Sequence, residues 1–568
     1  MKDNVMDLAK SWSQNIYFDQ EDRDELIALI ESNNQNEIHE RFYQSLKFGT
    51  GGLRSIIGFG ANRMNKYNVR KATHAMALVA QRNKKNNFRA CISYDCRQFS
   101  KEFALEAALV FCAHGFETFI FKELTPTPLL SYAVRYYEAD CGIMITASHN
   151  PKQYNGFKAY WNDGAQVTPP HDQEIIDQFN DITDWNEIPL LSQTDAQTKG
   201  LLHWIDNELF DKYYGLIENE VLDIEMCKKH GNELKVVFTP LHGTGLVPCQ
   251  EIAKRLFFTS FDVIESQAIF DSSFSNVETT PNPEDPKALK LAVAQMIQEN
   301  GDLAYGTDPD CDRLGVVVNN KGEPYYLNGN QIGLLLLDYR LKKLKEKNLI
   351  GPQAYILKSI VTSPLQRTIG ENFGVPTYDT LTGFKWMAQK ILEIESENKN
   401  AQFIFASEES FGYMPYNFVR DKDAVASMAL MNEVALFHKI EKRSLVDALD
   451  LIYEEYGFAK EDLISYTFEG SEGQSKINQI MSFFRNEVHS DFHDFEVEEK
   501  LDFENLTKTL IKNNTTEKIE MTSSNVLAFN FKNQTTLFLR PSGTEPKIKF
   551  YLMIQKSNGS IEEKKLAA

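Results

Sequence analysis

Strand-like and helix-like segments alternate along most of this sequence, and the alternation limits the folds that the chain can adopt. Short apolar runs at 91–95, 116–121 and 141–146 are typical of strands, and the two stretches between them carry helical patterns. We expect Ser100 to cap the first helix and Gly115 to end it. A β-α-β-α-β order builds a mainly parallel sheet, because each helix returns the chain to the starting edge of the next strand.

The same alternation recurs twice further along the chain. A second unit begins at 235–238 and ends near 303–318, and a third begins at 354–360 and ends near 403–406. The last stretch differs, because a helical segment is followed by two late strands that flank a turn. We therefore expect an α/β protein with three successive mixed, mainly parallel α/β sandwich domains and a C-terminal α+β domain, arranged around one central cleft.

The length of the chain supports four domains. At 568 residues it is too long for one hydrophobic core, and a composition of 42% hydrophobic and 25% charged residues is that of an ordinary globular protein. The expected domains span residues 1–206, 207–322, 323–445 and 446–568.

The balance of charges excludes several classes of partner. The chain has 80 acidic and 60 basic residues, which gives a formal net charge of -20 at pH 7. Because an acidic surface repels DNA, RNA and anionic lipids, we expect neither a nucleic acid nor a membrane as a partner. An anionic substrate would need a local cluster of Arg, Lys and backbone N–H groups.

The cysteines and the apolar runs indicate a cytoplasmic protein. The 7 cysteines are scattered without a CxxC pair, which favours neither a disulfide framework nor a zinc site. Residues 1–12 lack the apolar core of a signal peptide, and runs such as 332–337 are too short to span a bilayer. The oligomeric state stays open between a monomer and a small homo-oligomer.

The first polar cluster, TASHNP, follows the strand at 141–146. Ser148 is a candidate covalent nucleophile, because backbone N–H groups at a strand end can stabilise an oxyanion or a phosphate. His149 or Lys158 would serve as the acid or base. A hydrolase is disfavoured, because the G-x-S-x-G elbow is missing. Taken alone, the segment would also suit a plain turn.

The second cluster, DPDCDR, places Asp308, Asp310 and Asp312 two residues apart. In an extended or tightly turned loop this spacing points all three carboxylates to one side, where a hard cation would relieve their repulsion. An EF-hand is disfavoured, because Arg313 and Asn319 stand where that loop needs Gly and Glu. Because the loop supplies only a few oxygen ligands, a phosphate oxygen could also enter the coordination shell of the metal ion. We therefore favour one Mg²⁺ per chain.

Two further clusters suit a sugar phosphate. Residues 407–412 (SEESFG) follow the strand at 403–406, and their carboxylates and hydroxyls can pair with sugar hydroxyls, while Lys422 downstream could bind a phosphate. Residues 540–546 (RPSGTEP) offer a guanidinium, two hydroxyls and backbone N–H groups freed by a Gly turn. Because ligands bind outside the carboxyl ends of strands in open α/β sheets, loops from successive domains are expected to line one cleft.

In this order and spacing, the four clusters resemble those of the α-D-phosphohexomutases, the phosphoglucomutase and phosphomannomutase superfamily. TASHNP is similar to the family's phosphoserine loop, DPDCDR to its metal loop, EESFG to its sugar-recognition loop and RPSGTEP to its phosphate-binding loop. KFGTGGLR at 47–54, TPLHGTG at 239–245, PNPE at 281–284 and TGFK at 382–385 match as well, so the resemblance covers nearly the whole chain. It is greatest to the branch of bacterial α-phosphoglucomutases and phosphopentomutase-like eukaryotic mutases.

The resemblance implies an enzyme of the isomerase class. Such a mutase would interconvert glucose 1-phosphate and glucose 6-phosphate through a phosphoserine at Ser148 and a glucose 1,6-bisphosphate intermediate, which also acts as an activator. Mannose and pentose phosphates are alternative substrates, and a sugar-bisphosphate synthase with an external phosphate donor is an alternative enzyme. A catalytically dead sensor is disfavoured, because Ser148 and all three aspartates are present.

The resemblance also implies roles for individual residues. The ligands of Mg²⁺ would be Asp308, Asp310, Asp312 and an oxygen of the phosphorylated Ser148. The catalytic residues around the reacting phosphate would be Ser148, Arg54, His149 and Lys158, with Lys158 a candidate general acid or base. The substrate contacts would be Arg313, Thr382, Gly383, Lys385, Glu408, Ser410, Lys422, Arg540, Ser542, Gly543 and Thr544.

Overall fold

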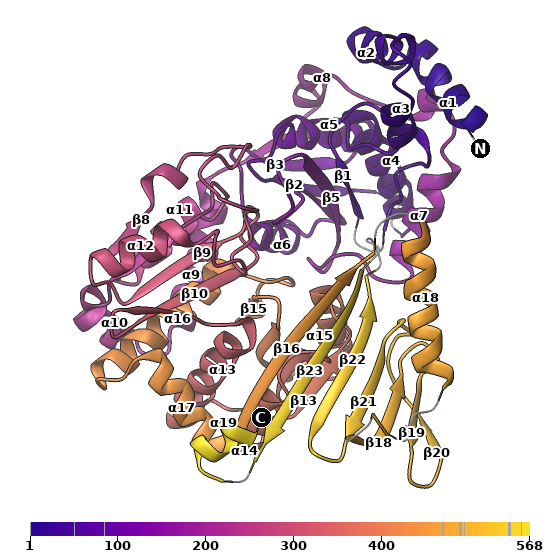
Figure 1. The fold of residues 1–568 in the computed structure, drawn as a ribbon. Coiled ribbons are helices and arrows are strands. Elements are labelled where there is room, and N and C mark those ends of the chain that lie inside the picture. Colours follow the sequence, from indigo (N-terminus) through magenta and orange to yellow (C-terminus); the bar gives the residue numbers. More distant parts are fainter. Residues whose placement is uncertain are drawn as a thin grey trace. The chain divides into compact units, whose positions relative to one another are not determined.

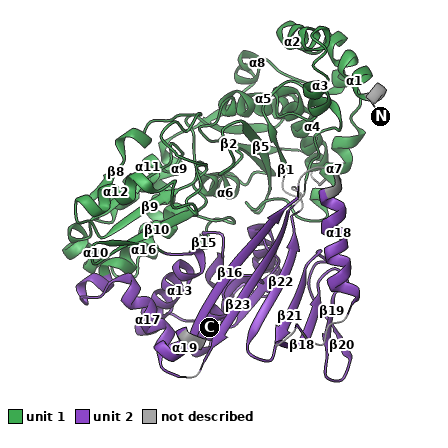
Figure 2. Cartoon of the chain, in the orientation of Figure 1, with its two compact units in different colours: residues 1–326, 412–436 green, residues 327–411, 437–568 purple. Residues whose placement is uncertain are grey.

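Figure 1 shows the computed structural model of the chain, coloured along the sequence. The structure describes residues 2–49, 52–83, 86–468, 471–487, 491–492, 495–542, 547–557 and 559–567. The chain divides into two compact units, one of residues 1–326 and 412–436 and one of residues 327–411 and 437–568 (Figure 2). Among the described helices, none is both long enough and apolar enough to cross a membrane.

Three helices at the N-terminus precede the first sheet. They are α1 (Lys2–Gln14), α2 (Gln20–Glu31) and α3 (Gln35–Phe42). Their apolar faces enclose a small aromatic core in which the rings of Trp12 and Phe18 stack with centroids 4.6 Å apart, and Phe59 and Tyr67 join it from the following segment. This core ties the N-terminal helices to the first sheet domain.

The first sheet has six strands in the order β1-β5-β4-β2-β3-β6. The strands are β1 (Gly52–Ile56), β2 (Arg89–Tyr94), β3 (Glu117–Phe121), β4 (Cys141–Ile145), β5 (Tyr154–Trp161) and β6 (Leu202–Ile205). β4, β2, β3 and β6 are parallel, whereas β5 runs antiparallel to both β4 and β1. The helices are α4 (Lys66–Asn83), α5 (Ser100–Ala113), α6 (Thr127–Tyr136), α7 (His171–Asp181), the short η1 (Trp185–Glu187) and α8 (Gln193–Thr198).

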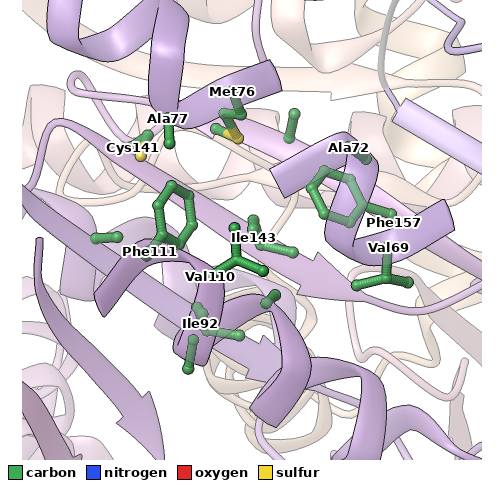
Figure 3. Packing of buried hydrophobic residues seen from close by; sticks show 14 of the residues in the cluster. Val69, Ala72, Met76, Ala77, Ile92, Val110, Phe111, Cys141, Ile143 and Phe157 are labelled. Carbon is green, nitrogen blue, oxygen red and sulfur yellow. The ribbon is translucent and has the colours of Figure 1, made fainter. Parts of the chain in front are cut away.

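Buried apolar side chains fill the space between this sheet and its helices (Figure 3). The residues that meet there include Val69, Ala72, Met76 and Ala77 from α4, Ile92 from β2, Val110 and Phe111 from α5, Cys141 and Ile143 from β4, and Phe157 from β5. The runs of fully buried residues in β2 and β4 are typical of strands covered on both faces. This packing fixes the strand ends from which the polar loops emerge.

The start of α5 corrects one expectation. Ser100 is not the cap: the N-cap position is Phe99, with φ +63°, and Ser100 is the first helical residue. Its hydroxyl donates to Asp95 Oδ1 at 2.8 Å and accepts a hydrogen bond from the side-chain amide of Asn155 at 3.0 Å, so it bonds to these side chains and not to a helix N–H group. Gly115 follows the helix with φ +82°, as expected of a residue that ends one.

The second sheet of the first unit has the order β11-β10-β9-β7-β8. Its strands are β7 (Val236–Thr239), β8 (Phe261–Val263), β9 (Leu303–Thr307), β10 (Leu314–Asn320) and β11 (Glu323–Tyr326). β9, β7 and β8 are parallel, and β10 is antiparallel to β9 and to β11. The other elements are α9 (Asn207–Glu220), α10 (Ile224–His230), η2 (Gly231–Glu233), α11 (Leu246–Arg255), η3 (Glu265–Gln267), α12 (Lys290–Gln298), β15 (Gly412–Met414) and most of α16 (Ala424–Ile440).

The second unit begins with a parallel sheet in which β12 lies between β13 and β14. Its elements are α13 (Gly329–Glu346), β12 (Ala354–Ser359), α14 (Leu365–Asn372), β13 (Thr377–Thr380), α15 (Phe384–Glu397), β14 (Gln402–Glu408) and α17 (Leu445–Tyr456). The carboxyl ends of β12 and β14 carry the polar segments that start at Ser359 and Glu408.

The unit ends in an antiparallel sheet of order β16-β23-β22-β21-β18-β19-β20, against which α18 packs. The elements are β16 (Phe458–Thr467), α18 (Ser471–Asn486), β17 (Asp491–Phe492), β18 (Phe495–Asp502), β19 (Thr507–Leu510), β20 (Thr515–Lys518), β21 (Leu527–Phe531), β22 (Thr535–Pro541), β23 (Lys547–Lys556) and α19 (Ile561–Ala567). A second core joins Ile360 and Leu381 to Phe538 and Tyr551, so the two sheets of this unit share apolar side chains. The expected class, three α/β domains followed by a C-terminal domain with its own sheet, is confirmed. The four domain boundaries and the central cleft stay predictions.

Candidate active site

Ser148 lies in the loop that follows β4, in the first unit. Its side chain is buried, and its backbone has φ +52°, in the left-handed region that residues with a Cβ rarely adopt. In this conformation Ser148 Oγ donates a hydrogen bond to Asp308 Oδ2 at 2.8 Å, and it lies 3.1 Å from His149 Nδ1. The candidate nucleophile therefore contacts both a candidate metal ligand and a candidate proton acceptor.

The three aspartates lie in the loop that connects β9 and β10. Asp308, Asp310 and Asp312 are buried, and one carboxylate oxygen from each lies within 4.8 Å of the other two. Burial raises the pKa of Asp308 well above its usual value, and the neighbouring Asp312 and Asp310 carboxylates raise it further. Three carboxylates this close repel one another unless a cation lies among them.

The oxygens of this group are suited to a hard divalent cation. Asp308 Oδ1 accepts hydrogen bonds from the N–H groups of Asp312 at 3.1 Å and Arg313 at 3.0 Å, which orient that carboxylate. By contrast, Asp310 Oδ1 and Asp312 Oδ1 are buried and accept no hydrogen bond from the described residues. Buried carboxylate oxygens without a donor are costly unless a ligand satisfies them, so the residues present fit a metal ion.

Two lysines compensate part of this negative charge. Lys158, on β5, donates to Asp310 Oδ2 at 2.6 Å and Asp312 Oδ2 at 3.2 Å. Although burial alone would lower the pKa of Lys158, Asp310 and Asp312 raise it above its usual value. Lys422, which the sequence assigned to a phosphate, lies 3.1 Å from both Asp312 Oδ2 and Asp421 Oδ1. Lys422 therefore belongs with the aspartate loop in this structure.

Three more predicted residues lie in or near the serine loop. Arg54, on β1, donates to Asn150 Oδ1 at 3.1 Å, and its side chain is exposed. Arg313 forms an ion pair with Glu284 of the PNPE segment. Burial lowers the pKa of His149 well below its usual value, and the Arg313 and Arg54 charges act in the same direction. A neutral imidazole beside Ser148 is able to accept a proton.

Two residues of the Arg54 segment, Thr50 and Gly51, lie outside the described part of the chain.

The residues assigned to the sugar lie in the second unit. Glu408, at the end of β14, accepts a hydrogen bond from the N–H of Gly383, whose φ is +113°. Thr382, the residue before Gly383, is half-buried. Lys385 is buried, and its Nζ lies 4.7 Å from the centre of the Trp386 ring. The structure thus brings the TGFK and EESFG segments together through Gly383 and Glu408.

The end of the EESFG segment faces the C-terminal sheet. Burial raises the pKa of Glu409 to about 7, and the neighbouring Glu408 contributes, whereas the positive charge of Arg540 opposes the shift. Ser359 Oγ donates to Glu409 Oε2 at 3.0 Å. Ser410, the next residue, is half-buried in the turn after β14. Arg540 therefore lies close to the predicted sugar loop.

Ser542 follows Arg540 at the end of β22. Its N–H donates to the carbonyl of Lys547 at 2.7 Å, which continues the antiparallel pairing of β22 with β23 by one residue. Gly543 and Thr544, which were also predicted to bind phosphate, lie outside the described residues.

Three residues with a place in the site were not predicted. Thr127, at the start of α6, donates its N–H to the Asp310 carbonyl at 2.9 Å and its hydroxyl to Asp310 Oδ2 at 2.8 Å. Asp95 and Arg97 form a fully buried ion pair beside the serine loop. Asp95 and Arg97 follow directly after the buried strand β2. The other clusters were recognised as polar residues just after a predicted strand, and this criterion would have found these two residues as well.

The chain matches known families over most of its length. Three family models, described as Phosphoglucomutase/phosphomannomutase, alpha/beta/alpha domains I, II and III, match residues 45–185, 211–322 and 328–456. A phosphoglucomutase from Staphylococcus epidermidis is 37% identical over 546 residues, which cover 96% of this chain and 97% of that protein. A phosphoglucomutase from Staphylococcus aureus is 36% identical and covers 92% of each chain.

Solved structures resemble the fold at lower sequence identity. The open form of the exocytosis-sensitive phosphoprotein pp63/parafusin (phosphoglucomutase) from Paramecium matches with a TM-score of 0.68 and 15% identity over 91% of each chain. A phosphoglucomutase/phosphomannomutase family protein from Burkholderia thailandensis matches with a TM-score of 0.60 and 16% identity, over 92% of this chain and 96% of that one. At these identities the likeness concerns the fold.

Proposed function

Because the chain belongs to the phosphoglucomutase/phosphomannomutase family, and is therefore an enzyme of the mutase class, we propose that it interconverts glucose 1-phosphate and glucose 6-phosphate. The observation that carries the proposal is the contact at 2.8 Å between Ser148 Oγ and Asp308, inside a buried group of three aspartates. The phosphoglucomutases at 36–37% identity support glucose as the sugar.

The reaction requires two transfers, each of one phosphoryl group. Phosphorylated Ser148 loses its phosphoryl group to a free hydroxyl of the sugar phosphate, so the Oγ–P bond breaks and a sugar O–P bond forms. The resulting glucose 1,6-bisphosphate turns around. Its other phosphate then returns to Ser148, and the product carries the phosphate at the opposite position. Phosphate is conserved over the cycle, and no external donor is consumed.

Charge neutralisation and positioning dominate phosphoryl transfer. Asp308, Asp310 and Asp312 would hold one divalent cation, which we propose to be Mg²⁺ and which would neutralise charge on the transferring phosphoryl group. Lys158 contributes a second positive charge at the same aspartates, and Arg54 contributes a third beside the serine loop. These residues favour a dianionic phosphate at Ser148.

Proton transfer must accompany each step. Neutral His149, 3.1 Å from Ser148 Oγ, is suited to accept the serine proton when the phosphoryl group returns. Lys158 is held in its charged form by Asp310 and Asp312 and is suited to donate. Because the two transfers at Ser148 are the reverse of each other, we assign His149 as the group that takes the serine proton when a phosphoryl group returns and gives it back when one leaves. Lys158 is then the candidate acid or base for the sugar oxygen, so that both groups regain their starting forms at the end of the cycle.

The second unit would bind the rest of the substrate. Glu408 is held by the Gly383 N–H and can accept hydrogen bonds from sugar hydroxyls, together with Ser410. Arg540 and Ser542 would bind the phosphate that is not reacting, with Gly543 and Thr544 of the same segment. Four further residues are assigned to the substrate on the family resemblance alone: Thr382, Lys385, Arg313 and Lys422.

A coupled assay over a panel of sugar phosphates tests the proposal. With Mg²⁺ and a trace of glucose 1,6-bisphosphate, glucose 1-phosphate should turn over with a higher kcat/KM than mannose 1-phosphate or ribose 1-phosphate. Intact-mass analysis should find one added phosphate on the wild type and none on Ser148→Ala. A higher kcat/KM for another sugar would reassign the substrate. If turnover strictly required an external phosphate donor, the enzyme would be a bisphosphate synthase. If no sugar phosphate were converted in the presence of glucose 1,6-bisphosphate, the mutase activity would be refuted.

We also propose a cytoplasmic location. All seven cysteines are free in the structure, which suits a reducing compartment. The oligomeric state, a monomer or a small homo-oligomer, stays a prediction. Fractionation followed by size-exclusion chromatography would test both.

A further inference from the structure

The backbone of Ser148 has a conformation that its own side chain disfavours. Its φ of +52° is left-handed, and single non-glycine residues keep such angles only where the surrounding structure holds them. The conformation matters, because it directs Ser148 Oγ toward Asp308. The contacts that hold the Ser148 N–H and carbonyl groups therefore decide where the nucleophile points.

The carbonyl side of Ser148 is held by Arg97. The Arg97 guanidinium donates to the carbonyl oxygens of Ser148 at 2.5 Å, Asn150 at 2.6 Å, Pro151 at 3.0 Å and Tyr154 at 3.0 Å. A planar group with five donors in fixed directions can satisfy four inward-pointing carbonyls, which the compact ammonium of a lysine cannot do. The Phe274 ring lies 5.2 Å from the guanidinium carbon and covers it.

The amide side of Ser148 is held by the partner of the same ion pair. Asp95 Oδ2 lies 3.3 Å from Arg97 Nε, and both side chains are fully buried. The same oxygen accepts the hydroxyl of Thr146 at 2.7 Å, and Thr146 Oγ1 in turn accepts the N–H of Ser148 at 2.8 Å. One buried ion pair thus fixes both peptide groups of the serine.

We propose that the Asp95–Arg97 pair is a positioning device for phosphoryl transfer, an inference that rests on the proposed mutase activity. The pair acts through the backbone of Ser148 and through Thr146, and it touches none of the three aspartates. Its task is to keep Ser148 Oγ aligned while the serine alternates between its free and phosphorylated forms. Because a small misplacement of a reacting atom slows chemistry more than it weakens binding, the pair should govern kcat and leave KM nearly unchanged.

Two variants remove different parts of the device. Arg97→Lys keeps the positive charge but loses the planar guanidinium with its several N–H donors. Thr146→Val removes the hydroxyl between Ser148 and Asp95 while keeping the side-chain shape. Arg89→Lys is the matched control. Arg89 lies at the start of β2, at the opposite end from Arg97, and it also donates to a backbone carbonyl, that of Tyr137 at 3.0 Å, and to a carboxylate, that of Glu117. Each protein is tested in the steady state and in a single turnover from glucose 1,6-bisphosphate to Ser148.

We expect Arg97→Lys and Thr146→Val to lower kcat and the single-turnover rate by about tenfold to a hundredfold, with KM within about twofold of wild type. Arg89→Lys should keep both rates. In Arg97→Ala, millimolar guanidinium should restore part of kcat, whereas the same concentration of urea should not. A purely structural pair would lower the melting temperature without lowering either rate in the protein that remains folded.

The outcomes separate the inference from the function on which it rests. If wild-type protein transfers no phosphate to Ser148, the proposed mutase mechanism is refuted. If wild type transfers phosphate and both Arg97→Lys and Thr146→Val do so at the wild-type rate, the positioning role is overturned. Should Arg97→Lys fail to fold, the Thr146→Val rate alone decides.

Discussion

At the scale of single residues, the three carboxylates of the aspartate loop repel one another, and Lys158 and Lys422 neutralise only part of their charge. Asp310 Oδ2 accepts hydrogen bonds from Thr127 and Lys158, but Asp310 Oδ1 is buried and accepts none from the described residues. An amide in place of this carboxylate would remove one like charge and one hard ligand, while its carbonyl could still accept both hydrogen bonds. The loop should therefore fold without the charge but lose its affinity for a cation.

We predict that Asp310→Asn lowers turnover by at least about a hundredfold while the fold is kept. Mg²⁺ should raise the melting temperature of wild type, because it binds only the folded state, and should not raise that of the variant. Thermal unfolding with Mg²⁺ and with chelator measures this. Full activity of wild type in excess chelator would contradict the metal site.

Arg540 is the second residue with a testable charge. We predict that Arg540→Ala lowers kcat/KM by about tenfold to a few hundredfold in both directions, because a bisphosphate that turns around presents each phosphate to it in turn. The pKa of Glu409 should rise above about 7, since the opposing positive charge is lost. Kinetics in both directions, with Arg367→Ala of the same unit as control, measure the effect. A loss confined to one direction would refute the assignment.

At the scale of elements, β5 connects the parts of the first-unit site. It carries Lys158, and it lies between β4, which leads to Ser148, and β1, which carries Arg54. Gly156 sits opposite Arg54 in this register. A Cβ at Gly156 would lie 2.5 Å from the Thr146 carbonyl oxygen and 2.8 Å from that of Leu53, so both neighbouring backbones exclude a side chain there.

We predict that Gly156→Ala destabilises the protein by about 1–3 kcal/mol, because two strands must move apart to accept the methyl group. Gly215→Ala is the control: it lies within α9, where a Cβ meets nothing within 4 Å. That change should stabilise by about 0.5–1 kcal/mol through its helix propensity. Urea unfolding of both variants measures the difference, and equal stabilities would show that β1 and β4 yield without cost.

At the scale of the whole molecule, stability at acid pH depends on histidines buried in their neutral form. His74 Nδ1 lies 2.7 Å from His114 Nε2, between α4 and α5. Burial lowers the pKa of His114 to about 4, and His74 adds to the shift. The unfolded chain, with an ordinary histidine pKa near about 6.5, takes up this proton first.

The histidine pair should therefore stabilise the protein fully above about pH 6.5 and lose this contribution as the pH falls toward about 4. Between about pH 6.5 and 4, wild type should lose free energy of unfolding because of this histidine pair. After allowance for solvent screening, we expect this loss to be smaller by about 1–2 kcal/mol in His114→Gln. Urea unfolding between these pH values measures the slope for wild type, for the variant and for His39→Gln, an exposed control. An unchanged slope in His114→Gln would contradict the prediction.

Local patterns determined much of this protein. The alternation of apolar runs and helical periods predicted β2, β3, β4 and the helices between them, because each of these strands has a run of apolar residues that is mostly buried. The spacing of the three aspartates likewise predicted their common orientation, since neighbouring residues in one loop constrain each other directly. In contrast, β20 (TTEK) is exposed and carries no apolar alternation, so its sequence holds no strand signal.

Only the tertiary structure decided which distant groups meet. Lys422 forms an ion pair with Asp312, which lies in a loop far from it in the sequence, and no local pattern around either residue indicates this pairing. Such choices depend on which charge is nearest after packing, and a buried ionic partner outweighs a local one because its field is not screened by water. The hold of Arg97 on the serine loop has the same origin: its four carbonyl partners come into reach only once β2, β4 and β5 lie side by side.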